Sequence, residues 1–103
     1  MERRKTALVT GASSGIGLDL AKRFAAEGFD VALVARSQGK LEEVARAIEA
    51  EHQVRAHVVT ADLAAPRAAE SLMAALEQRG LQIDVLVNNA GYALYGAFTD
   101  TDL

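Results

Sequence analysis

The sequence predicts an α/β fold in which helices cover both faces of a parallel sheet. Four short runs rich in apolar residues, 5–9, 30–35, 53–60 and 84–87, lack the strict alternation of half-exposed strands, and amphipathic segments of helical period separate them. A run of glycines joins the first strand to the first helix. Because strand-helix-strand crossovers are right-handed, these units give the strand order 3-2-1-4, the first half of a doubly wound sheet.

Each connecting segment has the apolar positions and the boundaries of a helix. The first helix is predicted over residues 15–27, and Gly28 follows it where a left-handed residue is favoured. Its apolar stripe consists of Ile16, Leu20 and Phe24, with Ala21 and Ala25 beside it. Ser37 is predicted to cap the second helix, whose apolar positions are Leu41, Val44, Ala45 and Ile48. The third is predicted to begin near Pro66 and to stop at Gly80, with Ala69, Leu72, Met73 and Leu76 as its apolar face.

The composition is that of one ordinary globular unit, so residues 1–103 are treated as a single, partial domain. The chain has 103 residues, is 50% hydrophobic and 24% charged, and has a formal charge of −3. It has no basic block for nucleic acid, no cysteine for a disulfide or thiolate metal site, and no apolar stretch as long as a membrane span. We expect a cytoplasmic protein without a signal peptide, a metal or a membrane partner.

The most informative segment is TGASSGIG, residues 10–17, directly after the first strand. A strand that turns sharply into a helix presents free N–H groups and the positive end of the helix dipole to an anion, and side chains at the crossing would obstruct a pyrophosphate. The segment therefore predicts a dinucleotide site, with a tight turn that binds nothing as the alternative. The glycines that keep the crossing open are Gly11, Gly15 and Gly17, the added hydroxyl donors are Ser13 and Ser14, and Ile16 opens the helix.

Arg36 and Ser37 stand at the end of the second strand, where a dinucleotide fold contacts the adenosine ribose. A carboxylate there would hold the 2′-hydroxyl of NAD, whereas the Arg36 guanidinium would form a charge-assisted contact with a 2′-phosphate. We therefore predict NADP(H) over NAD(H), with a solvated arginine as the alternative. The Ser37 hydroxyl has two compatible roles, at that phosphate or as a helix cap. Lys40 is close enough in sequence to add positive field there, but the helix surface is its simpler place.

Together, TGASSGIG, the Asp62-Leu63 pair after the third strand and the motif Asn88-Asn89-Ala90-Gly91 after the fourth resemble the N-terminal half of a short-chain dehydrogenase/reductase. The resemblance covers essentially the whole chain. It implies a Rossmann-like fold and hydride transfer between a nicotinamide and a small carbonyl or alcohol.

The resemblance also implies further cofactor contacts. Asp62 and Leu63 match the adenine contacts of the family, although a loop or helix N-terminal position is the simpler role for Asp62. The residues expected to border the cofactor ribose are Asn89, Ala90 and Gly91, and Asn88 is expected to be structural. His52 and His57 have no paired acid or second ligand at useful spacing, so both are expected on the surface.

No catalytic residue is expected in this chain. Members of the family use a tyrosine as general acid or base, a lysine four residues later, and a serine that orients the substrate. The tyrosines here are Tyr92 and Tyr95, and four residues beyond them stand Gly96 and Thr99. Both tyrosines are therefore assigned to the lip of the pocket or to local packing.

The end of the sequence suggests a truncated chain. Thr99 resembles the N-cap of a helix with an acid at its third position, and the wholly apolar segment 85–87 would be a sticky edge if no strand followed. Two function classes stay open. The chain is either the cofactor half of an NADP-dependent oxidoreductase, inactive alone and acting on a small molecule when full-length, or a non-catalytic nucleotide-binding or interaction module that pairs with a partner or a second copy.

Overall fold

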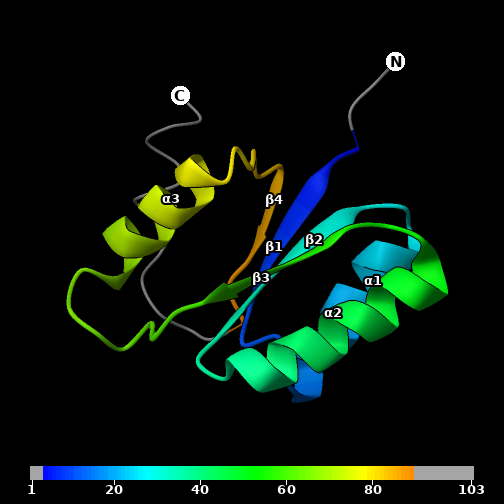
Figure 1. Cartoon of the computed structure of the whole chain (residues 1–103), viewed down its shortest axis with the longest axis horizontal. Helices are drawn as coiled ribbons and strands as arrows, with labels where there is room; N and C mark the ends of the chain where they lie inside the picture. Colours follow the sequence, from blue (N-terminus) through cyan, green and yellow to red (C-terminus); the bar gives the residue numbers. More distant parts are fainter. Residues whose placement is uncertain (1–3, 90–103) are drawn as a thin grey trace.

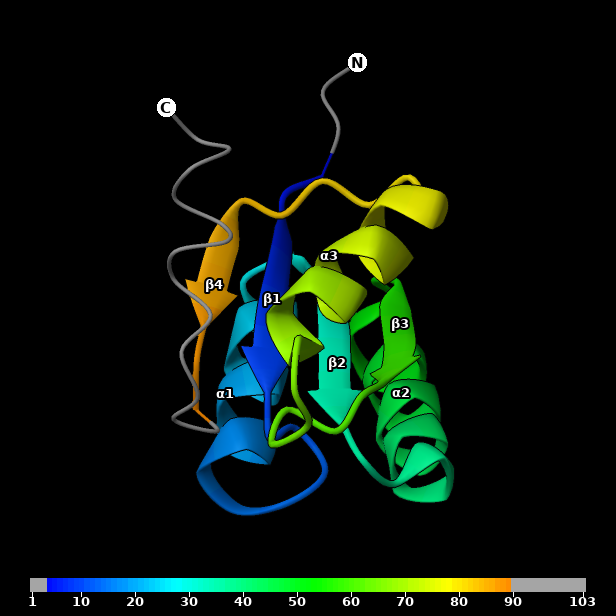
Figure 2. The same ribbon diagram turned by 90° about the vertical axis from the view of Figure 1, so that its left-hand side faces the viewer.

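The computed structural model describes residues 4–89 of the chain, which form a four-stranded parallel sheet with helices on both faces. The strands are β1 (Thr6–Thr10), β2 (Asp30–Ala35), β3 (Ala56–Thr60) and β4 (Val85–Val87), and the helices are α1 (Gly15–Ala26), α2 (Gln38–His52) and α3 (Ala68–Gln78). The strand order is β3-β2-β1-β4, as predicted. Helices α1 and α2 cover one face of the sheet and α3 covers the other (Figures 1 and 2).

Each face of the sheet has its own hydrophobic core. Val9 and Leu33 pack toward α1 and α2, whereas Leu8 and Val34 pack toward α3, and all four side chains are fully buried. Because successive residues of a strand point to opposite faces, burial on both faces requires the continuous apolar runs that the sequence contains. The predicted apolar positions of α2 are confirmed, since Leu41, Ala45 and Ile48 are buried.

The predicted apolar face of α1 is confirmed at Ala21 and Ala25, which are buried, and wrong at Ile16. Ile16 is 70% exposed, and the buried positions of the helix are Gly17, Ala21 and Ala25. Small side chains let the helix axis lie close to the sheet, so the larger residues are displaced to the flank of the contact. There the Phe24 ring packs edge-on against Phe29 instead of entering the centre of the core.

Two predicted boundaries are also wrong. Helix α2 continues to His52 and Gln53 takes a left-handed φ of 57°, so β3 begins at Ala56 and not at residue 53. Pro66 lies in a turn before α3, because Arg67 has a φ of 63° and the helix begins only at Ala68. Gly28 and Gly80 do adopt the left-handed conformation predicted after α1 and α3.

Candidate functional site

The carboxyl ends of three neighbouring strands surround one cavity of about 430 Å³. It lies at the point where the chain leaves β1 for α1 and β2 for α2, which is where doubly wound sheets bind ligands. Six residues singled out in the sequence line it, namely Gly11, Ser13, Arg36, Ser37, Asp62 and Leu63. The remaining lining residues, which the sequence did not mark as site residues, are Ala35, Lys40, Ala61 and Ala64.

The glycine turn after β1 is built by close backbone approach. Gly11 has a φ of 65°, and the following amide of Ala12 donates to Val34 O at 3.2 Å, which ties the turn to β2. A Cβ atom at Gly17 would collide with the Gly11 carbonyl oxygen and would lie 2.8 Å from Asn89 Nδ2. Only glycine therefore fits where the helix crosses the turn.

Four predicted residues of this segment, Ser14, Gly15, Ile16 and Gly17, are not part of the cavity lining. Ser14 is the N-cap of α1 but its side chain makes no capping hydrogen bond, and Gly15 and Ile16 form the exposed first turn. The first N–H groups of a helix lack intrahelical acceptors and the dipole is positive there, so this turn presents donors to solvent.

The end of β2 contributes a basic lining. Ser37 Oγ accepts from Lys40 N at 3.5 Å, so the predicted capping role of Ser37 is confirmed. Lys40 is exposed on the first turn of α2, as expected, but it also lines the cavity with Arg36. The signal for Lys40 was its place four residues after Arg36 in the same capped turn. Within residues 4–89, neither Arg36 nor Lys40 makes a side-chain hydrogen bond or ion pair.

The end of β3 contributes Asp62 and Leu63. Asp62 Oδ1 accepts from Ala64 N at 3.0 Å, a local turn that is the simpler role considered for this residue. The Leu63 side chain is buried in the core beneath α3. The adenine contacts of both residues stay a prediction.

The end of β4 is tied to β1. The fully buried Thr10 hydroxyl donates to Asn88 Oδ1 at 3.2 Å, the kind of structural role expected for Asn88. Asn89 is exposed beside Gly17. The predicted ribose residues Ala90 and Gly91, together with both tyrosines, lie outside the described residues.

Both histidines differ from their expected surface positions. The His52 side chain is 20% exposed and its Nε2 lies 3.6 Å from Glu51 Oε1, and His57 is half-buried on β3. Burial lowers the pKa of His57, with Arg55 and Arg79 lowering it further and Asp30 and Glu49 opposing them. In the described part of the chain, no group of three acidic or histidine side chains could hold a metal ion. Over the same residues, no helix has the length and apolar character needed to cross a membrane.

A parallel doubly wound sheet with a glycine turn at this edge defines a Rossmann-like fold. The chain belongs to the short chain dehydrogenase family, whose model matches residues 5–103. A fatty acyl-CoA reductase from Acinetobacter baylyi is 47% identical over 90 residues, which are 87% of this chain and 30% of that protein. A very-long-chain 3-oxoacyl-CoA reductase-B from Danio rerio is 41% identical over 87 residues, 84% of this chain and 27% of that protein.

Solved structures of similar proteins contain the reduced phosphorylated dinucleotide. The L-sorbose reductase from Gluconobacter frateurii, complexed with NADPH and L-sorbose, is 40% identical with a TM-score of 0.78 over 84% of this chain and 33% of its own. A short-chain dehydrogenase from Sphingobium yanoikuyae in complex with NADPH is 40% identical with a TM-score of 0.75, over 84% of this chain and 34% of its own. The chain thus spans about a third of the length of the proteins it matches.

Proposed function

We propose that this chain holds the adenosine and pyrophosphate parts of NADP(H) for an oxidoreductase acting on a small carbonyl or alcohol. The observation that carries the proposal is the cavity in which the glycine turn lies opposite Arg36, Ser37 and Lys40. When bound, the nicotinamide supplies or accepts the hydride. The residues proposed to hold the cofactor are Gly11, Ser13, Ser14, Gly15, Ile16, Gly17, Arg36, Ser37, Asp62, Leu63, Asn89, Ala90 and Gly91.

The glycine turn fits a pyrophosphate. Gly15 and Ile16 at the start of α1 are exposed, and the first N–H groups of a helix lack intrahelical acceptors. A phosphate there would gain the helix dipole, worth about 0.3–2 kcal/mol, as well as direct hydrogen bonds. Gly17 lets the turn lie directly on the helix, which a side chain would prevent. This part of the site serves NAD and NADP equally.

The basic lining favours the phosphorylated cofactor. Arg36 and Lys40 place two positive side chains at one cavity, and no carboxylate at the end of β2 would repel a 2′-phosphate. The NADPH-bound proteins similar to this chain support the same choice. A relative named for fatty acyl-CoA and a solved structure with L-sorbose match 87% and 84% of this chain, which supports a role for the chain other than selecting the substrate.

Arg36→Ala tests the cofactor choice. Loss of a charge-assisted contact worth about 1.5–3 kcal/mol should weaken NADPH binding by roughly tenfold to a hundredfold and leave NADH binding unchanged. Equilibrium titration followed by cofactor fluorescence measures both affinities. Arg46→Ala, which removes an exposed arginine of α2 outside the cavity, is the matched control. An unaltered ratio of NADPH to NADH affinity in Arg36→Ala would show that Arg36 does not set the preference.

Measuring catalytic turnover distinguishes the two hypotheses, an oxidoreductase and a non-catalytic nucleotide-binding module. NADPH oxidation with a panel of carbonyl compounds should be absent for residues 1–103 alone and present for a polypeptide extended to the length of the relatives. Cofactor binding without turnover by the extended polypeptide would favour the module. Turnover by residues 1–103 would contradict the expectation that the chemistry needs further residues.

A further inference from the structure

The outer edge of β3 is the feature that the cofactor site leaves unexplained. β3 is the terminal strand of the order β3-β2-β1-β4 and pairs only with β2 in the described sheet. Val31 N donates to Arg55 O, and Ala61 N donates to Ala35 O. Because backbone groups alternate in direction along a strand, the N–H and C=O groups of Ala56, Val58 and Thr60 point away from β2. Such an edge is a template for a strand from another chain.

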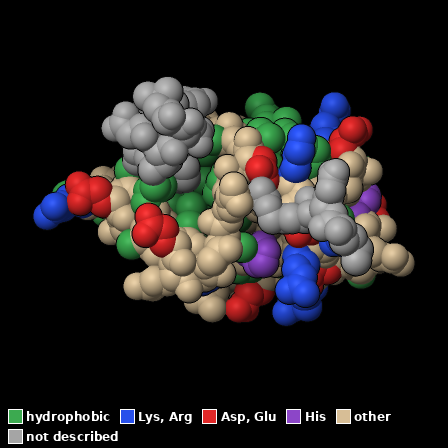
Figure 3. Space-filling model, turned by 90° about the horizontal axis from the view of Figure 1, so that it is seen from above, with side chains coloured by type: hydrophobic (Ala, Val, Ile, Leu, Met, Phe, Trp, Pro, Cys, Tyr) green, Lys and Arg blue, Asp and Glu red, His purple; other side chains and the backbone are tan. Residues whose placement is uncertain are grey.

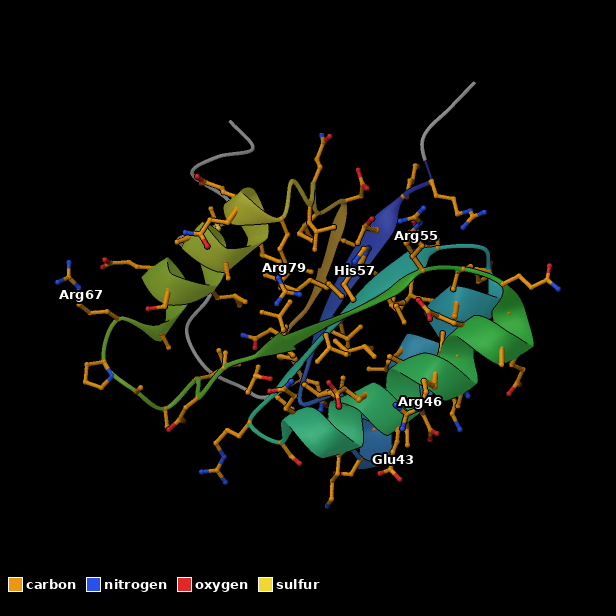
Figure 4. All side chains as sticks on the ribbon, viewed as in Figure 1. Glu43, Arg46, Arg55, His57, Arg67 and Arg79 are labelled. Atoms are coloured by element: carbon orange, nitrogen blue, oxygen red, sulfur yellow. The ribbon has the colours of Figure 1, made fainter. Side chains whose placement is uncertain are left out.

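Two charged side chains already occupy this edge. The amide of Ala56 donates to Glu49 Oε2 at 2.9 Å, and Arg79 Nη1 donates to the carbonyl oxygen of Val58 at 2.6 Å. Glu49 belongs to the last turn of α2 and Arg79 follows α3, so the two side chains approach β3 from opposite faces of the sheet. Figure 4 shows Arg79 between the end of α3 and β3.

The chemistry of each side chain matches the backbone group that it covers. A carboxylate accepts from the outward amide, and a guanidinium donates to the outward carbonyl. Within residues 4–89 neither Glu49 nor Arg79 forms an ion pair. Glu49 also lies near the carboxyl end of α2, where the helix dipole disfavours a negative charge. A carboxylate at this position is therefore not explained by stabilisation of α2.

We propose that Glu49 and Arg79 block the β3 edge, so that it does not pair with the same edge of a second copy of this chain. An incoming strand needs the Ala56 amide and the Val58 carbonyl for its own ladder, and it obtains them only by displacing both charged groups. The two exposed charges would also have to leave water as the strand arrives. This block acts on self-association and is independent of the proposed cofactor.

Glu49→Ala combined with Arg79→Ala should open the edge. We expect the self-association constant to rise roughly tenfold for each of these two side chains removed, as measured by sedimentation equilibrium of the purified protein. The matched control is Glu43→Ala combined with Arg46→Ala, which removes the same charges from exposed positions of α2 (Figure 4). This control should associate no more than the parent protein.

Hydrogen exchange shows which edge is used. The outward amides of Val58 and Thr60 should become protected as the double variant associates. Adding Thr60→Pro removes one outward N–H without breaking a bond to β2, and should return association to the parent level. Unchanged association in the double variant, or a rise without protection of these two amides, would overturn the proposal. If the double variant does not fold, the same measurements are made on each single variant, for which a roughly tenfold rise in the self-association constant is expected.

Discussion

The two ends of the sheet use charged side chains in opposite ways. At the amino end, Asp30 Oδ1 accepts from Arg55 N at 2.9 Å and from Arg4 Nη1 at 3.1 Å. Beside it, Asp84 Oδ2 accepts from Thr6 N at 2.8 Å. Figure 3, which looks onto this end of the molecule, shows acidic and basic side chains next to one another. The charges here are used to fix the starts of the strands.

At the carboxyl end, the basic groups are not used by the fold. Arg36 and Lys40 line a cavity and make no side-chain hydrogen bond or ion pair within residues 4–89. Exposed charges without partners add little to the stability of a fold, but they remain available to a ligand of opposite charge. The comparison therefore separates residues that should govern stability from residues that should govern cofactor affinity.

Gly17→Val should break the carboxyl end most severely. The new side chain would collide with the Gly11 carbonyl oxygen, and relief of that overlap moves the turn away from the helix. We expect a loss of about 1–3 kcal/mol in the free energy of unfolding and a loss of roughly a hundredfold in NADPH affinity. Urea denaturation and fluorescence titration measure the two quantities.

Gly39→Ala is the control for that substitution. A Cβ at Gly39 meets no atom within 4 Å, and the residue lies inside α2. Replacing glycine by alanine inside a helix should raise stability by about 0.5–1 kcal/mol. If Gly17→Val instead binds NADPH as tightly as the parent protein, the close crossing of turn and helix is not needed for the site.

The topology, most of the core and most element boundaries could be predicted from the sequence, but the start of β3 and the start of α3 could not. Continuous apolar runs such as Val31 to Val34 predict strands buried on both faces, and right-handed crossovers then leave one strand order. The start of β3 depends on Gln53, whose left-handed conformation nothing in its residue type demands. In α1 the prediction was wrong at Ile16, because the helix packs on the sheet through its smallest residues, Gly17, Ala21 and Ala25.

The site could be predicted at positions where the required chemistry allows only one type of residue. The glycines of the turn and Arg36 at the end of β2 belong to this kind. Lys40 was close enough in sequence to add positive field beside Arg36 but was assigned to the helix surface, because its place in the cavity depends on how the loops after β2 and β3 face each other. That relation is set by tertiary packing, and the local sequence indicates only that Lys40 follows Arg36 by four residues.

Asp30→Asn should weaken the amino end and leave the cofactor site intact. The neutral amide keeps one acceptor oxygen but loses the ion pair to Arg4 and the charge-assisted bond to the Arg55 amide. We expect about 1 kcal/mol lower stability in urea denaturation, with unchanged NADPH affinity. Asp19→Asn, at an exposed position of α1, is the control for the loss of one negative charge. A change in NADPH affinity as large as that of Arg36→Ala would contradict the conclusion that charges at the amino end of the sheet govern stability and not cofactor binding.

Lys40→Ala should produce a smaller change at the carboxyl end. An exposed lysine beside a bound phosphate contributes through a screened charge, so we expect roughly a twofold to fivefold loss of NADPH affinity that shrinks as salt is added. NADH affinity and stability should not change. Lys22→Ala, on an exposed position of α1 outside the cavity, should have no effect on either cofactor. Equal losses for NADPH and NADH would place Lys40 away from the 2′-phosphate.

The smallest expected effect is the pH dependence of stability contributed by His57. Burial is the main cause that lowers the pKa of His57 below its ordinary value of 6.5, so the unfolded chain takes up the proton first as the pH falls. The contribution of the neutral imidazole is therefore complete above about pH 6.5 and is lost as the pH falls toward the lower pKa of the folded state. In His57→Gln the urea midpoint should therefore fall less than in the parent protein between about pH 7 and 5.5. If the urea midpoint of His57→Gln falls with pH as steeply as that of the parent protein, a group other than His57 causes the pH dependence. The charged groups around β3 would then affect stability independently of His57.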